Sequence, residues 1–252
     1  MSTSPAFLPF LLRIADTNLI LSQRLSEWTG HGPFLEEDLA LTNIALDILG
    51  TSRSIYEYAA KIENKGRSED DLAFLRNERQ FLNPLICELP KGDYAFTIFR
   101  QCIVDAFQFH FYNALTISTD ETLAGIAAKA VKETTYHLRH TSSWMERFGC
   151  GTEESHHRLQ NAMNEIWRYT DDLFDMPEGY ADLVKTKVAP EMMSVKENVQ
   201  KELLPIIERS TISIPDPSFM QTGSVKGIHT EHLGYLLAEM QYMQRMYPGS
   251  RW

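Results

Sequence analysis

The sequence predicts an all-α protein with a ferritin-like four-helix bundle and additional C-terminal helices. Apolar side chains recur at three- and four-residue steps through most of the chain, the spacing of helices with one buried face. Alternating strand patterns are absent, and four long helical segments form two pairs with a shorter segment between them. This order predicts a single domain over residues 1–252, with a bundle core over about 5–149 and a helical extension over about 152–252.

The first pair of helices is expected before residue 64. The first helix begins near residue 5 or 9, where proline is tolerated in a first turn, and ends near residue 28. Its polar stripe of Asp16, Gln23 and Glu27 is either a solvated face or a source of one inward carboxylate. The second helix spans residues 35–63 and begins with an acidic run that the helix dipole favours.

A shorter helix over residues 69–88 is expected to join the two pairs. The third long helix follows over residues 94–118. Asp105 lies in its middle among phenylalanines, which is an unusual environment for a carboxylate. The fourth runs from about residue 120 to 148 and carries Glu133, His137 and His140 along one flank of its apolar face. A carboxylate and imidazoles at the inner edge of a long helix are typical of metal sites in bundles.

The C-terminal part is expected to add three helices. They span about residues 152–174, 181–209 and 229–246, and the second can kink at Pro190 and near Pro205. The proline, serine and glycine content of residues 210–227 predicts an extended linker.

The overall composition excludes several classes of protein. The formal net charge of -10 argues against a nucleic-acid binder, which usually has a basic face. Three widely spaced cysteines favour reduced thiols, and we expect a cytoplasmic protein. No uninterrupted apolar run of about 18 residues predicts a membrane span.

A catalytic di-iron bundle needs a Glu-x-x-His pair on each of two helices and a single carboxylate on each of the others. Among the eight histidines, only His156 and His157 follow an acid at that spacing. Both lie in the expected first turn of one helix outside the bundle core, where an exposed helix start is the simpler interpretation. The complete double motif is therefore absent.

The remaining candidates form a degenerate set: Asp47, Gly50, Asp105, Glu133 and His137. Asp47 is followed at three residues by Gly50, where a ligand histidine is missing, and Asp105 could be the single carboxylate of its helix. Glu133 and His137 are either a buried hydrogen-bonded pair that links helices or ligands in a distorted turn. We expect no catalytic, cofactor or metal site in this chain.

Other motifs are weaker. His229, Glu231 and His232 could bind a metal, or could contact the linker or neighbouring chains. The chain has no GxGxxG, P-loop or GxSxG motif.

Several long segments occur in the order found in a known family. They are LLRIADTNLILSQRLSEWTGHGPFLEEDLALTNIALDILGTSR, DDLAFLRNERQF, KETTYHLRH with GTEES, EIWRYTDDLFD and KGIHTEHLGYLLAEMQYMQRMYPG. Together they resemble the C subunits of bacterial ring-1,2-phenylacetyl-CoA epoxidases over nearly the whole chain, least distinctively over about residues 179–224.

This resemblance implies a ferritin-like structural subunit without a working metal site, which acts in aerobic phenylacetate catabolism. It implies pairing with a catalytic A subunit that holds the di-iron centre, alongside other subunits that include a reductase with flavin and an iron–sulfur cluster. Aromatic and methionine side chains of the last helix are candidate contacts: Tyr235, Met240, Tyr242, Met243, Met246 and Tyr247.

Two alternatives remain open. One is an autonomous di-iron or di-manganese oxidase or oxygenase that uses Asp47, Asp105, Glu133, His137 and an acid of the first helix. The other is an all-α binding module without oxygen chemistry.

Overall fold

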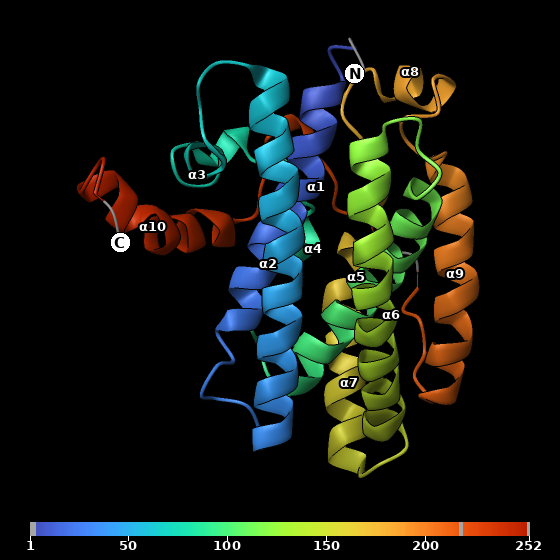
Figure 1. Ribbon diagram of the computed structural model, residues 1–252. Coiled ribbons are helices and arrows are strands. Elements are labelled where there is room, and N and C mark those ends of the chain that lie inside the picture. The colour runs from blue at the N-terminus through green and yellow to red at the C-terminus, as the bar shows by residue number, and fades with distance from the viewer. Residues whose placement is uncertain (1–3, 217–218, 251–252) are drawn as a thin grey trace.

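The computed structural model describes residues 4–216 and 219–250, which form α-helices and short 3₁₀ turns without any strand. Four long helices make the bundle: α1 (Phe7–Ser26), α2 (Leu35–Glu63), α5 (Tyr94–Leu115) and α6 (Glu121–Gly149). They come as the antiparallel hairpins α1/α2 and α5/α6, which lie side by side in Figure 1. The predicted all-α, ferritin-like fold is confirmed.

Local chemistry explains where these helices begin and end. Asp93 and Asp120 are N-caps, and their carboxylates accept hydrogen bonds from the backbone N–H groups of Phe96 and Leu123 at 2.8 and 3.0 Å. Asn64 ends α2 in the left-handed region, with a φ of 52°. Such caps make the bounds of the long helices readable from the sequence.

The predicted single helix over residues 69–88 is wrong. The structure has α3 (Glu69–Phe74), a 3₁₀ turn at Glu78–Gln80 and α4 (Leu85–Glu88). Asn77 is extended and forms a capping box with Gln80, and Pro84 precedes α4. Because the intervening chain is not helical, Arg76 can direct its side chain between α1 and α2.

Two bounds in the C-terminal part are also corrected. α7 (Glu153–Ile166) ends before residue 174, and the chain continues as 3₁₀ turns at Trp167–Tyr169 and Asp171–Phe174. The helix expected over 181–209 is interrupted: α8 (Tyr180–Lys185) is followed by a turn through Pro190. α9 (Met192–Arg209) then starts afresh, capped by Glu191. Pro205 remains inside α9.

The last helix, α10 (Glu231–Met246), leaves the bundle on the side of α1 and α3 and projects sideways (Figure 1). The described residues between α9 and α10 contain no α-helix, as predicted, and include a short 3₁₀ turn at Ser224–Lys226. Buried apolar side chains from Ala6 to Leu237 nevertheless form one continuous core. Within the described residues, no helix is both long enough and apolar enough to cross a membrane.

Candidate functional site

The interior face of α6 is set by Thr134, His137 and Thr141, all of which are buried. Glu133 lies at the edge of that face, and its carboxylate is 3.4 Å from the ammonium group of Lys129 on the same helix. Burial raises the pKa of Glu133, and Lys129 opposes this effect. The position three residues before His137, where a ligand carboxylate would stand, is the threonine Thr134.

His137 reaches across to α2. Its Nε2 lies 3.1 Å from Oδ2 of Asp47, whose side chain is 40% exposed at the rim of the bundle. Burial lowers the pKa of His137, while the hydrogen bond and charge of Asp47 act in the opposite direction. The pair is a hydrogen-bonded link between α2 and α6. Thus His137 does link helices, but its partner is Asp47 instead of Glu133.

His140 lies close to a second carboxylate of α2. Its Nε2 is 3.2 Å from a carboxylate oxygen of Glu37, which also accepts a 2.6 Å hydrogen bond from the hydroxyl of Tyr94. Both histidines of the predicted flank therefore face carboxylates of α2.

Gly50 lies on the outer side of α2. A Cβ added there would meet no atom within 4 Å, and the residue borders an open groove with Leu49, Arg53 and Phe74. Since Asp47 points toward α6 at the rim, the two positions do not converge on the bundle interior. The structure thus does not bring Gly50 together with the other candidate residues.

Asp105 is fully buried in α5 and already has hydrogen-bond donors for both carboxylate oxygens. Gln101 Nε2 donates at 2.7 Å and Thr141 Oγ1 at 2.9 Å. Burial raises the pKa of Asp105 to about 7, and these two hydrogen bonds oppose that rise. The carboxylate is satisfied by neutral groups of α5 and α6.

The centre of the bundle carries amides and a phenol that the sequence analysis did not single out. Asn18 of α1 donates to the hydroxyl of Tyr112 at 2.8 Å and accepts from Gln108 at 3.1 Å. A cavity of about 20 Å³ beside them has room for about one water molecule. Asn18 stands in the middle of a predicted helix, directly before three apolar residues, which was the available signal.

The donor set does not fit a di-iron centre. Such a centre needs carboxylates and imidazoles from all four helices converging within bonding distance. In residues 4–216 and 219–250, no group of three or more His, Cys, Asp or Glu side chains is placed to hold a metal ion. The polar groups of the interior are largely amides and hydroxyls, together with the imidazole of His137 and the satisfied carboxyl group of Asp105.

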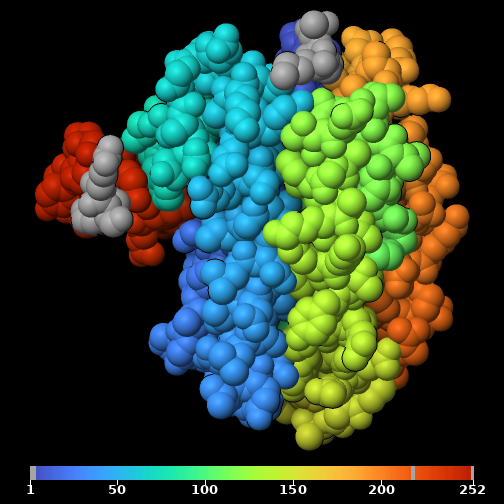
Figure 2. All heavy atoms as spheres, in the orientation of Figure 1, coloured from blue at the N-terminus to red at the C-terminus, as the bar shows by residue number. Residues whose placement is uncertain are grey.

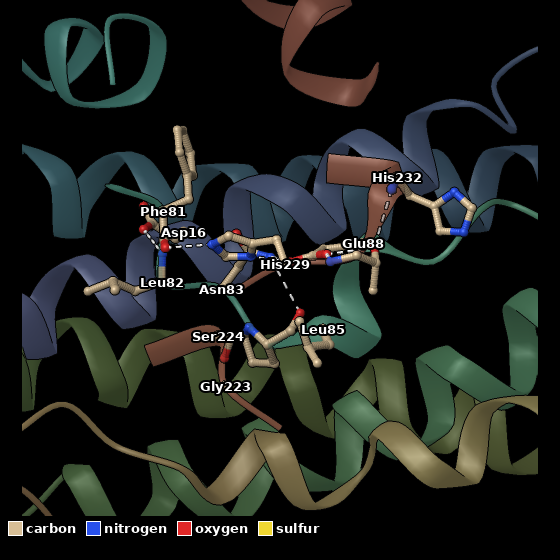
Figure 3. A network of polar contacts seen from close by, with 12 residues as sticks. Asp16, Phe81, Leu82, Asn83, Leu85, Glu88, Gly223, Ser224, His229 and His232 are labelled. Atoms are coloured by element: carbon tan, nitrogen blue, oxygen red, sulfur yellow. Dashed lines mark hydrogen bonds and ion pairs between the residues drawn. The ribbon is translucent and has the colours of Figure 1, made fainter. Parts of the chain in front are cut away.

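A second polar network lies outside the bundle interior and involves the carboxylate of the first helix. Asp16 is buried and forms an ion pair with Arg76, and Tyr56 donates a hydrogen bond to it. The backbone N–H of Leu82 donates to it at 2.8 Å (Figure 3). Asp16 is therefore buried and not part of a solvated face, but it holds the α3–α4 connection instead of facing the bundle interior.

The same region fixes the C-terminal linker. The carboxylate of Asp172 accepts hydrogen bonds from the hydroxyl of Ser224 at 2.6 Å and from the backbone N–H groups of Leu85 and Gly223. Arg13 donates to the Ser224 hydroxyl at 2.6 Å. These contacts attach the linker to α1 and α4.

His229 is buried against Glu88, and together they form what we call the α10 anchor. Its Nδ1 lies 2.5 Å from Oε1 of Glu88, and its Nε2 lies 2.9 Å from the carbonyl oxygen of Phe81. Glu88 also accepts from the backbone N–H and hydroxyl of Thr230, both at 2.7 Å. The ring of His232 points away from this cluster (Figure 3), so the two histidines do not share a site.

Comparison with known proteins agrees with this fold. The chain belongs to the family described as phenylacetic acid catabolic protein, whose family model matches residues 2–252. A similar characterised protein is the C subunit of the 1,2-phenylacetyl-CoA epoxidase of Escherichia coli (strain K12). The two are 46% identical over 243 residues, which cover 96% of this chain and 98% of the relative.

Proposed function

We propose that this chain is a non-catalytic structural subunit of a multicomponent phenylacetyl-CoA 1,2-epoxidase in aerobic phenylacetate catabolism. In this role it pairs with the catalytic A subunit and stabilises it. The proposal is supported by the relative's name, which designates a subunit of such an epoxidase. It also predicts a cytoplasmic assembly with the other epoxidase subunits.

One observation carries the non-catalytic part of the proposal. The candidate ligands have other partners: Asp105 accepts from Gln101 and Thr141, and Asp47 faces His137 at the rim. A buried carboxylate without a metal needs hydrogen-bond donors, and Asp105 has them. The bundle interior therefore has the chemistry of a structural core.

In this proposal the chain itself holds no cofactor. The di-iron centre belongs to the catalytic A subunit, and flavin and an iron–sulfur cluster belong to the reductase subunit. The part of this chain is to present a rigid, folded surface to its partner.

Metal analysis tests this division of roles. The purified chain is expressed alone with iron and manganese supplied, and again together with its cognate catalytic subunit. We expect no stoichiometric metal in the lone chain and about one di-iron centre per heterodimer. About two irons per lone chain, lost in a His137→Ala variant, would show that His137 is a working ligand and would refute the proposal.

The last helix agrees with a role in assembly, since Tyr235, Tyr242 and Met246 are each more than half exposed. Removing residues 228–252 should weaken co-purification with the catalytic subunit. The deletion also removes His229 and leaves Glu88 buried without its ion-pair partner. Tyr242→Glu is therefore the cleaner variant, because it changes the exposed face without touching the α10 anchor.

A further inference from the structure

The outer face of α2 carries a regular stripe of four leucines together with Thr42 and Arg53, which we call the α2 seam. Its members are Leu35, Leu39, Thr42, Leu46, Leu49 and Arg53. The steps between them alternate between four and three residues, which is a repeat of 3.5 residues per turn. At 1.5 Å per residue the seam is about 27 Å long.

The leucines of the seam remain largely exposed, although Thr42 contacts Thr29 and Arg53 pairs with Glu57 and Glu69. The four leucines, in order along α2, are 70%, 54%, 59% and 38% exposed, whereas the core-facing Leu41, Ile44 and Ile48 are buried. In Figure 2, no other segment lies over the middle and lower part of α2. An exposed row of leucines of this length marks an interaction surface rather than scattered surface residues.

A groove of about 520 Å³ continues the seam toward α3. Leu46 and Leu49 border it on the α2 side, and Ala73 and Phe74 border it on the α3 side. Gly50 leaves its floor open, because no atom lies within 4 Å of the place where a Cβ would stand. The groove can accept a large side chain from a neighbouring helix.

The repeat identifies the kind of structure that fits. A 3.5-residue repeat keeps an apolar row facing one neighbouring helix along its whole length, as in coiled coils. A strand or an irregular loop does not match that period. The occupant is therefore a long amphipathic helix.

The charged residues beside the seam indicate which kind of helix would bind there. Glu36 and Asp70 lie at the two ends of the seam and groove, and in the described residues neither carboxylate has an ion-pair partner. The charge of Arg53 is already paired with Glu57 and Glu69. A helix with basic side chains beside its apolar row would complement them. α10 is not the occupant, since the α10 anchor holds it against α3 and α4.

We propose that the α2 seam docks a long amphipathic helix, with basic flanks, of the catalytic subunit. This inference rests on the proposed function and specifies which face of the chain the partner covers. The seam forms the apolar centre of the interface, and the groove beside Gly50 receives one bulky side chain of the partner helix.

The test compares a double leucine variant with a control variant, each co-expressed with the cognate catalytic subunit. The test variant is Leu39→Glu combined with Leu46→Glu. Met193→Glu on α9 is the control, because Met193 is 62% exposed and lies away from α2. Heterodimer dissociation on dilution is followed by mass photometry, and thermal unfolding of each lone chain checks the fold.

We expect the double variant to fold normally and to bind about 100-fold more weakly than the wild type, since two central leucines are replaced by charges. The control should bind as the wild type does. Unchanged binding by the double variant would refute docking at the α2 seam but would leave the proposed function intact. Failure of the wild-type chain to bind would overturn both.

A homodimer provides a further outcome. If the lone wild-type chain dimerises and the leucine variant is monomeric yet still binds the catalytic subunit, the seam joins two copies of this chain. That result would also overturn the proposal.

Discussion

Replacing Asp105 by asparagine should stabilise the protein at neutral pH. The carboxyl group has no exposed surface, and its pKa is raised from 3.8 to about 7 because burial disfavours the charged form. The unfolded chain releases this proton near pH 4, but the folded chain retains it until about pH 7. Above pH 7, ionised Asp105 therefore lowers the free energy of unfolding by about 4 kcal/mol, at 1.36 kcal/mol per pKa unit.

The asparagine side chain removes this cost while keeping the hydrogen bonds. Thr141 can still donate to the carbonyl oxygen of the new amide. Gln101 has a buried Oε1 without a hydrogen-bond partner, so rotation of its amide presents that oxygen to the new NH₂ group. Asp105→Asn therefore replaces a buried ionisable group with a neutral one of nearly the same shape.

The assay is urea unfolding of the wild type and variant at several pH values. Because the pKa of the acid is raised on folding, wild-type stability from this group falls as pH rises from about 4 to about 7. Between pH 5 and pH 7.5, the advantage of the variant should grow by about 2.5 kcal/mol. Asp47→Asn is the control: its side chain is partly exposed, so a change below about 1 kcal/mol is expected. A variant less stable than the wild type at pH 7.5, or a pH-independent difference, would refute the reasoning.

The remaining predictions concern the polar networks and two glycines. Arg76→Ala should lower the free energy of unfolding by about 3–5 kcal/mol, measured in urea, because it leaves Asp16 buried without its ion-pair partner; a loss below about 1 kcal/mol would contradict this. His229→Ala should expose α10 to hydrogen exchange before the bundle unfolds. Burial lowers the pKa of His229, but Glu88 and the Phe81 carbonyl group outweigh burial and raise it. The stabilisation is therefore full below pH 6.5 and is lost as pH rises through the raised pKa; equal exchange in α10 and the bundle would count against it. Gly149→Ala should lower the melting temperature, since its Cβ would overlap the carbonyl oxygen of Ser210. Gly50→Ala, which meets open space, should raise it through a gain of up to about 1 kcal/mol in helix propensity. If both glycine substitutions changed the melting temperature in the same direction, the space around each glycine would not explain their effects.

The sequence predicts the long helices well because their signals are local. The bounds of α2 agree with prediction, since an acidic run begins the helix and Asn64 ends it. The single helix predicted over residues 69–88 fails for a non-local reason. Arg76 leaves the helical path to reach Asp16, which lies 60 residues earlier in the chain.

In the candidate site, too, local features could be predicted from the sequence and contacts between helices could not. The sequence places His137 at the inner edge of its helix and Asp105 among phenylalanines, and the structure buries both. The choice between Glu133 and Asp47 as the partner of His137 depends on how α2 and α6 are rotated against each other, and no single helix encodes that rotation. The absence of a metal in this chain stays a prediction that metal analysis can test.

The α10 anchor also sets the order in which a nascent chain can become complete. Glu88 is made 141 residues before His229, the residue that neutralises it in the buried site. At 5–20 residues per second, the ribosome needs roughly 7–28 s to supply that partner. During this interval Glu88 has its hydrogen bond from Asn83 but not its ion-pair partner, so we expect the α4 region to reach its final packing only after residue 229 has been made. A segment at the end of the chain thus completes the packing of a segment made much earlier.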